Sequence, residues 1–220
     1  MLYSITRAFV VSLTLIASAS NAATSNECTF TWSMTAYKMS LGRIVDTVSW
    51  SSDKVAVSSV FTPSSTATFL GAPVITRLFE SSARSGLSRR EEFHTKGGAE
   101  VDYTLWTSQN NQLRFSSQRS SLGSVQEMPS ASVYIDSTSL PYLDLSEDGL
   151  TDGAFKRAVL NQKEPYTASL IKSGNVLEYR SGQKRGRVWL ENKRPVRMAF
   201  SDGKDSFEGH VVSWECGVPK

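Results

Sequence analysis

Phe30-Thr31-Trp32-Ser33-Met34-Thr35-Ala36 alternates apolar side chains with small hydroxyl side chains. Successive side chains of a β-strand point to opposite faces, so a period of two predicts a strand with one buried face. The same alternation recurs along the chain in short runs rich in β-branched and aromatic residues. These runs lie at 44–50, 55–61, 101–105, 113–115, 133–135, 176–179, 188–190, 196–200 and 207–214. The pattern predicts a mainly β domain.

Short polar segments separate these runs. Residues 109–112 read Gln-Asn-Asn-Gln, 173–175 read Ser-Gly-Asn and 201–204 read Ser-Asp-Gly-Lys. Such residues favour tight turns, and consecutive strands joined by tight turns pair antiparallel. We therefore expect an antiparallel meander.

Two segments have features of short helices. Pro73 opens an apolar run that ends at Gly86, and the same run also fits a strand from Arg77 to Ser82. Thr151 and Asp152 are suited to cap a helix that reaches residue 160. Residues 117–132 are rich in serine, glutamine and glycine, which predicts a long surface loop.

Residues 1–22 have the three parts of a secretory signal peptide. Arg7 precedes an apolar run at 8–17, and small residues follow up to Ala22. The apolar run is shorter than the roughly 20 residues that a membrane-spanning helix needs. We expect cleavage after Ala22, a mature domain at 23–220, no membrane span after cleavage, and a periplasmic or secreted location.

Cys28 and Cys216 are the only two cysteines of the chain. An exported protein meets an oxidising compartment, which favours a disulfide between them. Free thiols and a metal pair are the alternatives, but no histidine lies near either cysteine at ligand spacing. We expect a structural disulfide and no metal.

Charge and motifs exclude several classes of function. The net charge is +3, of which Arg7 contributes one, and this is too little to indicate nucleic acid. No P-loop, G-x-G-x-x-G or G-x-S-x-G motif occurs. His94 and His210 have nearby glutamates but lack a helical metal-site spacing. A hydrolase built on these histidines is the least favoured hypothesis, and we expect no catalytic residue, no cofactor and no enzyme activity.

Two groups of side chains are candidates for binding. Arginines gather in two neighbouring runs, and a hairpin formed by these runs would present them to an anionic envelope partner. Alternatively, the charges only keep an exposed sheet edge solvated and prevent it from pairing with other molecules. Tryptophans in strand-like segments would give a curved sheet an apolar face, which either fills the core or holds an apolar ligand. The arginines are Arg185, Arg187, Arg194 and Arg197, and the tryptophans are Trp32, Trp50, Trp106, Trp189 and Trp214.

Several pieces of the chain resemble a family of exported bacterial proteins classed as a domain of unknown function. They are 39–43 with its glycine, 55–61, Leu140-Pro141-Tyr142, and the pair 187–190 and 194–198. The resemblance implies the curved antiparallel sheet of periplasmic lipoprotein carriers, a half-open barrel that holds acyl chains. The chain differs from those carriers in having few predicted helices to plug the barrel.

These observations together predict one β-rich exported domain, a curved antiparallel sheet or half-barrel with one or two short helices. The leading hypothesis for its function is non-enzymatic binding of a lipidic or other apolar ligand on the tryptophan-rich face. The alternative is a structural or interaction module that docks an anionic envelope protein or polymer through the arginine-rich hairpin. An open sheet interior would favour the first, and a packed interior would favour the second.

Overall fold

In the computed structural model, the described part of the chain is one continuous sheet. The structure describes residues 26–217 apart from 83, 110–111, 118–119, 128–133, 137, 147–149 and 160–165. Its fifteen strands are β1 (Asn26–Ala36), β2 (Met39–Trp50), β3 (Lys54–Pro63), β4 (Val74–Ser82), β5 (Leu87–Lys96), β6 (Ala99–Gln109), β7 (Gln112–Ser117), β8 (Ser120–Glu127), β9 (Tyr134–Ile135), β10 (Gly153–Val159), β11 (Tyr166–Ser173), β12 (Val176–Ser181), β13 (Lys184–Glu191), β14 (Arg194–Ser201) and β15 (Ser206–Gly217). The predicted signal peptide lies outside the described residues.

The strand order shows two meanders that meet in the middle of the sheet. It runs from β8 back to β1, continues to β15 and then descends to β9. All neighbours pair antiparallel except β9, which is parallel to β10. The central pair places Cys28 directly opposite Cys216, and the two form a disulfide. The mainly β fold, the antiparallel sheet and the disulfide are therefore confirmed.

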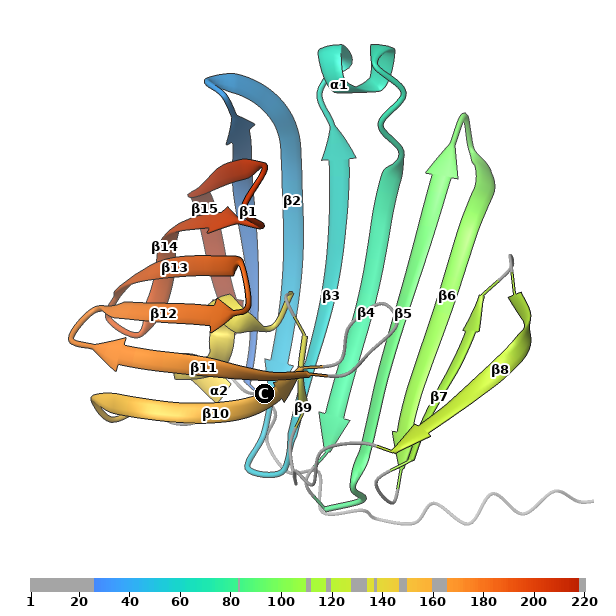
Figure 1. Cartoon of the computed structure of the whole chain (residues 1–220). Coiled ribbons are helices and arrows are strands. Elements are labelled where there is room, and N and C mark those ends of the chain that lie inside the picture. Colours follow the sequence, from blue (N-terminus) through green and yellow to red (C-terminus); the bar gives the residue numbers. More distant parts are fainter. Residues whose placement is uncertain are drawn as a thin grey trace, which may run out of the picture.

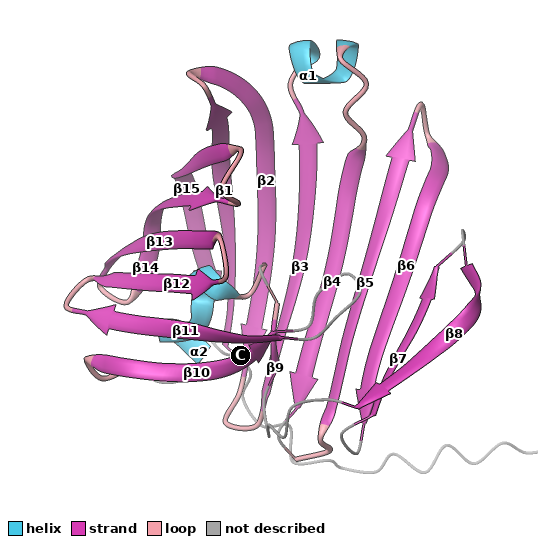
Figure 2. Ribbon diagram, in the orientation of Figure 1, coloured by secondary structure: helices cyan, strands magenta, loops and turns pink. Residues whose placement is uncertain are grey.

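The sheet curves so strongly that its two meanders face each other. In Figures 1 and 2, β11 to β14 cross the direction of β2 to β6, and a short helical segment lies between the two parts. Strand twist accumulates over many strands, and bulges add bends. Register shifts occur between Thr31 and Trp32, between Met34 and Thr35, and in three other strand pairs. The sheet is curved without being closed into a barrel.

The main hydrophobic core lies on the concave side of this sheet, between β1 to β3 and β11 to β14. In β1, Phe30, Trp32 and Met34 are buried and their neighbours are less so, as the period of two predicts. A Cβ atom at Gly209 would lie 2.8 Å from Met34 Sδ and 2.9 Å from Met198 Cε. Glycine at this position therefore lets the two methionines pack against the backbone of β15.

The number of short helices agrees with the prediction, but their places do not. The two α-helices are α1 (Ser65–Phe69) and α2 (Leu143–Ser146), and the 3-10 turn η1 (Leu140–Tyr142) leads directly into α2. Among the described residues, none of these is long and apolar enough to cross a membrane.

One open alternative was settled and two local predictions were wrong, because strand pairing overrides local composition. The helix alternative at 73–86 is excluded, because in β4 Phe79 is buried and Leu78 is 39% exposed, which is a period of two. The helix predicted from Thr151 is replaced by β10, which pairs residue by residue with β11. The loop predicted at 117–132 contains β8, which pairs with β7 in spite of its serine-rich composition.

Candidate functional site

A row of polar side chains crosses the concave face of the sheet. Strand pairing places Asp46, Ser59, Arg77 and Glu92 next to one another on β2 to β5. Directly opposed residues share a face, so these side chains point into the same space. Asp46, Ser59 and Glu92 are buried. Buried polar groups require partners, which makes this row the first place to look for a site.

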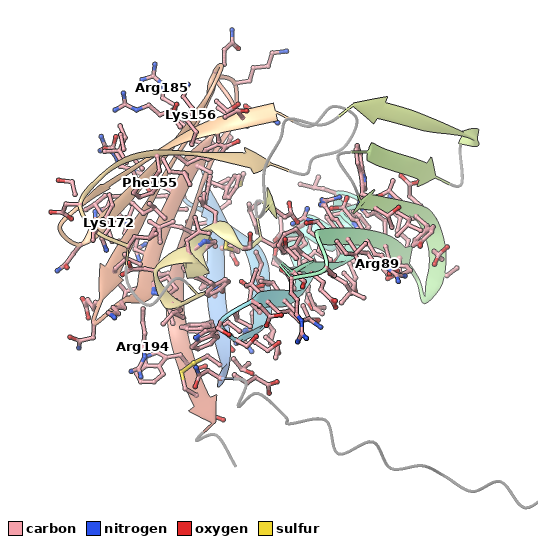
Figure 3. All side chains as sticks on the ribbon, turned by 90° about the horizontal axis from the view of Figure 1, so that it is seen from below. Arg89, Phe155, Lys156, Lys172, Arg185 and Arg194 are labelled. Carbon is pink, nitrogen blue, oxygen red and sulfur yellow. A yellow bond between two sulfur atoms is a disulfide. The ribbon has the colours of Figure 1, made fainter. Side chains whose placement is uncertain are left out.

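The partners come from a segment that lies inside the curve of the sheet. We call Asp136 and residues 138–145 the plug; it includes η1 and most of α2. Figures 1 and 3 both place this segment between the two meanders. Leu140, Tyr142 and Leu143 belong to the same buried cluster as Phe30, whose ring centroid is 5.0 Å from that of Tyr142. The plug fills the concave side at this point.

Tyr142 joins the plug to β1 and β2. Trp32 Nε1 donates a hydrogen bond of 2.8 Å to Tyr142 Oη, which in turn donates one of 2.5 Å to Asp46 Oδ2. Burial raises the pKa of Asp46 to about 6, although Ser59, Tyr142 and Arg77 act in the opposite direction. Burial and the nearby Asp46 carboxyl raise the pKa of Tyr142 well above its ordinary value, so the phenol keeps its proton and remains a donor.

Arg90 joins the plug to β5. Its Nε donates to Asp136 Oδ2 at 3.0 Å and its Nη2 donates to Glu92 Oε2 at 2.7 Å, and all three side chains are almost fully buried. Arg77 Nε lies 2.6 Å from the same Glu92 oxygen, and His94 Nε2 lies 2.7 Å from the other. Burial alone would raise the pKa of Glu92, but Arg77 and Arg90 outweigh it and lower the value to about 2.

A further ion pair joins the plug to the opposite meander, β9 to β15. Lys172 Nζ on β11 lies 3.0 Å from Asp144 Oδ2 on α2, and both side chains are buried. Lys172 is labelled in Figure 3. The buried charges of the concave face therefore hold the plug between the two meanders. Breaking a buried pair by removing one partner costs several kcal/mol, so the network stabilises a packed interior.

Four of the five tryptophans belong to the concave side, and they are covered to different degrees. Trp32 and Trp106 are fully buried, and Trp50 packs against the core. Trp214 is 44% exposed, with the Arg194 guanidinium 3.9 Å from the centre of its ring. The structure thus does not bring these rings together on one accessible face.

Trp189 lies on the convex side with three of the arginines singled out from the sequence. The ring of Trp189 is 4.6 Å from the Arg197 guanidinium, and Arg197 Nη2 also lies 3.1 Å from Glu208 Oε2. Arg185 and Arg187 follow on β13, with both side chains exposed. Arg194 is at the other end of the hairpin, opposite Glu191, and it is well separated from Arg185 in Figure 3.

A groove runs along β14 on this convex side. We call it the arginine groove, and its volume is about 280 Å³. It is lined by Glu178, Tyr179, Arg180, Arg185, Gly186, Arg187, Ala199, Phe200, Ser201, Ser206, Phe207 and Glu208. Pairing puts Arg180, Arg185 and Ser201 in one cross-strand row, and the small side chains of β14 leave room beside the arginines.

Ion pairing leaves one arginine of this groove without an acidic partner. Glu178 pairs with two arginines: its carboxylate oxygens lie 2.8 Å from Arg180 Nη2 and 3.0 Å from Arg187 Nε. The hydrogen bond from Arg180, partly offset by desolvation and helped by Arg187, lowers the pKa of Glu178. Within the described residues, Arg185 has no carboxylate at ion-pair distance. Its five donors are available to an anion from outside.

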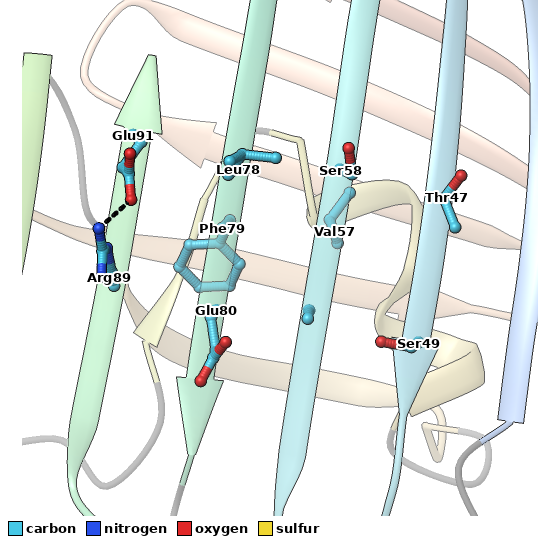
Figure 4. A pocket seen from close by; sticks show the side chains of 10 residues that line it. Thr47, Ser49, Val57, Ser58, Leu78, Phe79, Glu80, Arg89 and Glu91 are labelled. Carbon is cyan, nitrogen blue, oxygen red and sulfur yellow. Dashed lines mark ion pairs between the residues drawn. The ribbon is translucent and has the colours of Figure 1, made fainter. Parts of the chain in front are cut away.

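A second groove lies on the convex side of β2 to β5 (Figure 4). Its volume is about 400 Å³, and small side chains such as Thr47, Ala56 and Ser58 form its floor. Its charged groups are already paired: Arg89 contacts Glu91, and Glu80 lies 3.1 Å from Lys54. The charged side chains that line this groove are therefore paired with one another or with Lys54, and no unpaired charge among them would attract a ligand.

The two histidines lie on separate strands, each beside a glutamate. His94 contacts Glu92 as described above, and His210 Nε2 is 3.8 Å from Glu208 on the exposed convex side. Among the described residues, no group of three histidine, cysteine or acidic side chains is arranged to hold a metal ion. The hydrolase hypothesis gains no support from this geometry.

The sequence analysis missed the residues that hold the plug. In β2, Asp46 points to the same face of the sheet as Ile44 and Val48. In β5, Arg90 points to the same face as the buried Ser88. A charged residue in phase with a buried face is the signal that would have identified them. Leu140-Pro141-Tyr142 was noticed only as a piece of a resemblance, and its position inside the sheet was not predicted.

Comparison with known proteins identifies the fold and little more. No protein-family model matches the chain, and no curated protein matches it. A similar solved structure is the "Crystal Structure of Beta-barrel-like Protein of Domain of Unknown Function DUF1849 from Brucella abortus". The TM-score is 0.58 at 9% sequence identity, and the match covers 88% of this chain and 98% of that chain. The likeness supports a β-barrel-like fold, and the resemblance to lipoprotein carriers stays a prediction.

Proposed function

We propose that this chain is an exported, non-enzymatic interaction module that binds an extended anionic segment of an envelope protein or polymer in the arginine groove. The observation that carries the proposal is Arg185, an exposed and unpaired guanidinium, within the described residues, beside a groove floored by Ala199 and Ser201. The predicted signal peptide and the disulfide support export.

Charge distribution favours an anionic occupant. From residue 176 to 201 the chain carries seven arginine and lysine residues against two glutamates, a net charge of +5, whereas the whole chain carries +3. Arginine binds carboxylates and phosphates through paired donors. The groove follows β14, so a chain lying in it would be extended and would place acidic groups against Arg185 and Arg187.

The packed interior is the reason for placing the function on the surface. Trp32 is covered by Tyr142, and the buried ion pairs of the plug hold this cover in place. A ligand on that face would have to displace the plug, which would take Tyr142 from Asp46, Asp136 from Arg90 and Asp144 from Lys172, at a cost of several kcal/mol. A surface groove requires no such rearrangement.

The experiment uses two defined probes, fluorescent polyglutamate and fluorescent polyphosphate, with anisotropy measured at low and high salt. We expect saturable binding that weakens with salt, and a loss of roughly threefold to tenfold in affinity for Arg185→Ser, since a hydrogen bond to a charged group contributes about 1.5 kcal/mol or less at an exposed site. Preference for one probe identifies carboxylate or phosphate as the recognised group.

The variant with Arg185, Arg187, Arg194 and Arg197 all changed to serine should lose binding. Arg84→Ser is the matched control, because Arg84 is exposed in the turn before β5 and lies away from the groove. Equal binding by the fourfold variant and the wild type would reject the proposal, and so would an equal loss in the control.

One observation favours apolar ligand binding as a second candidate. Phe207 and Trp214 belong to concave-face rows of β15, yet they are 39% and 44% exposed. Both rings are accessible, and each would offer a separate small apolar contact to a lipidic ligand, because seven positions of extended strand, roughly 20 Å, lie between them. Organic extraction of the purified protein followed by mass spectrometry tests this candidate: lipid at a stoichiometric level supports it, and its absence counts against it.

A further inference from the structure

The end of the sheet that carries α1 presents large apolar side chains to solvent. Phe69 is 90% exposed and Leu70 is 75% exposed, and α1 buries none of its five residues. Figures 1 and 2 show α1 at the tip of the β3–β4 connection. Exposed apolar groups of this size that make no contribution to a core mark an interaction surface when they are contiguous with others.

The connection between β1 and β2 extends this apolar surface. Tyr37 is 64% exposed and Met39 is 55% exposed. Ser64, the residue that caps α1, donates from its backbone N–H to Leu41 O and from its hydroxyl to Ser40 O, each at 2.8 Å. These bonds fix α1 beside the start of β2, so that the four apolar side chains project from the same end of the sheet.

Cationic side chains flank the apolar ones. Lys38 lies between Tyr37 and Met39, and the Lys96 ammonium would be 3.6 Å from a Cβ atom built at Gly71, directly after α1. Residues 64–73 contain no acidic residue. The acidic groups at this end are Asp202, Asp205, which accepts a 3.0 Å hydrogen bond from Tyr37 Oη, and Glu100. We call Tyr37, Lys38, Met39, Phe69, Leu70 and Lys96 the α1 rim.

The backbone holds two of these side chains in unusual conformations. Tyr37 and Lys38 have φ angles of +49° and +64°, a region that asparagine and glycine occupy more readily. A two-residue hairpin turn requires these angles, and the chain meets the requirement with a tyrosine and a lysine. Both side chains are thereby fixed at the tip of the hairpin, beyond the last pair of the ladder.

We propose that the α1 rim binds the surface of an anionic lipid bilayer. Phe69 and Leu70 enter the headgroup region, Tyr37 and Met39 lie beside them, and Lys38 and Lys96 contact lipid phosphates. The rim is a projecting tip, and neither of the two grooves described above is lined by its residues, which suits a deformable bilayer better than a peptide. Apolar insertion combined with lysine contacts is the general basis of peripheral membrane binding.

The test is co-sedimentation of the protein, produced from the full-length chain, with vesicles of phosphatidylglycerol and phosphatidylcholine and with vesicles of phosphatidylcholine alone. We expect binding to the anionic vesicles and weaker binding to the neutral ones. Phe69→Ser combined with Leu70→Ser should lower partitioning at least about tenfold, because burial of one such side chain corresponds to roughly one to two powers of ten. All variants carry the same predicted signal peptide or lack it alike, so any effect of this segment cancels when their partitioning is compared.

Charge variants and controls complete the experiment. Lys38→Glu combined with Lys96→Glu should weaken binding to anionic vesicles and reduce its salt dependence. Val212→Ser is the matched apolar control, because Val212 is 57% exposed in the middle of β15, and it should bind as the wild type does. Arg185→Ser should also bind vesicles normally, which separates this inference from the proposed function.

Two results would overturn the proposal. One is partitioning of the Phe69 and Leu70 double variant that equals that of the wild type. The other is self-association without vesicle binding: a dimer in sedimentation velocity that the double variant abolishes would assign the rim to a contact between copies of the chain.

Discussion

The buried carboxyl of Asp46 should make the stability of the protein depend on pH in a defined window. Its pKa is raised from 3.8 to about 6, chiefly by burial. A difference of about two units corresponds to about 3 kcal/mol, at about 1.36 kcal/mol per unit. Below about pH 4 the group is protonated in both states. Between about pH 4 and pH 6 only the unfolded state loses the proton, so the free energy of unfolding falls and then becomes constant.

Replacing Asp46 by asparagine removes this ionisation and keeps the shape of the side chain. The amide oxygen still accepts the hydrogen bond from Tyr142, which in the wild type is 2.5 Å long. The difference in unfolding free energy between Asp46→Asn and the wild type should therefore shift by about 3 kcal/mol between about pH 4 and pH 7, with the variant gaining at the higher pH.

Urea denaturation followed by tryptophan fluorescence measures this difference directly. Glu92 titrates in the opposite sense: its pKa is lowered to about 2, so its contribution to stability is present above its unfolded value and is lost as the pH falls toward 2. This loss begins near pH 5, inside the chosen window, but Glu92 is present in both proteins and its contribution cancels from the difference between them. Asp152→Asn, at an exposed position, is the control for a loss of charge without burial. A variant with the same difference from wild type at both pH values would refute the reasoning.

Two further changes test the packed interior and the seam of the sheet. Tyr142→Phe leaves a buried donor and a buried acceptor without partners and should lower the free energy of unfolding by about 2 to 4 kcal/mol in urea denaturation, whereas Tyr37→Phe, which loses one exposed hydrogen bond, should cost less than about 1 kcal/mol. Replacing Cys28 and Cys216 by serine opens a link across 188 residues and should cost about 5 kcal/mol in the chain-entropy model; reduced wild type should behave like the double variant, and an unchanged urea midpoint would contradict the assigned role.

The sequence was most informative where one physical rule acted alone. The alternation in β1 depends only on side-chain direction in a strand with one buried face, and the observed burial follows it residue by residue. The cysteine pairing followed from the oxidising compartment that the leader implies. The sequence left β4 undecided and failed at β10, where a helical pattern and a strand pattern shared the same apolar residues. Pairing with β5 and β11 decided between them, and such pairing is not local in sequence.

The plug could not be predicted because its contacts connect distant residues. Tyr142 and Asp46 are 96 positions apart, and Arg90 and Asp136 are 46 apart. The parity of Asp46 shows that a charged group faces the core, but it does not identify what neutralises it. The arginines were easier to find, since exposed charges depend little on the fold. Their arrangement around Ala199 and Ser201 required the register of β13 and β14.

The arginine groove and the α1 rim meet at the turn between β14 and β15, so the two proposed ligands would bind next to each other. Ser201 and Ser206 line the groove at the ends of β14 and β15, and Asp205 between them accepts a hydrogen bond from Tyr37 of the rim. A segment aligned with β14 would therefore end beside a bilayer held at the rim. The binding residues of the two surfaces do not overlap, so vesicle-bound protein should still bind the polyglutamate or polyphosphate probe. Mutual exclusion of probe and vesicle would instead mean that one anion-binding surface serves both.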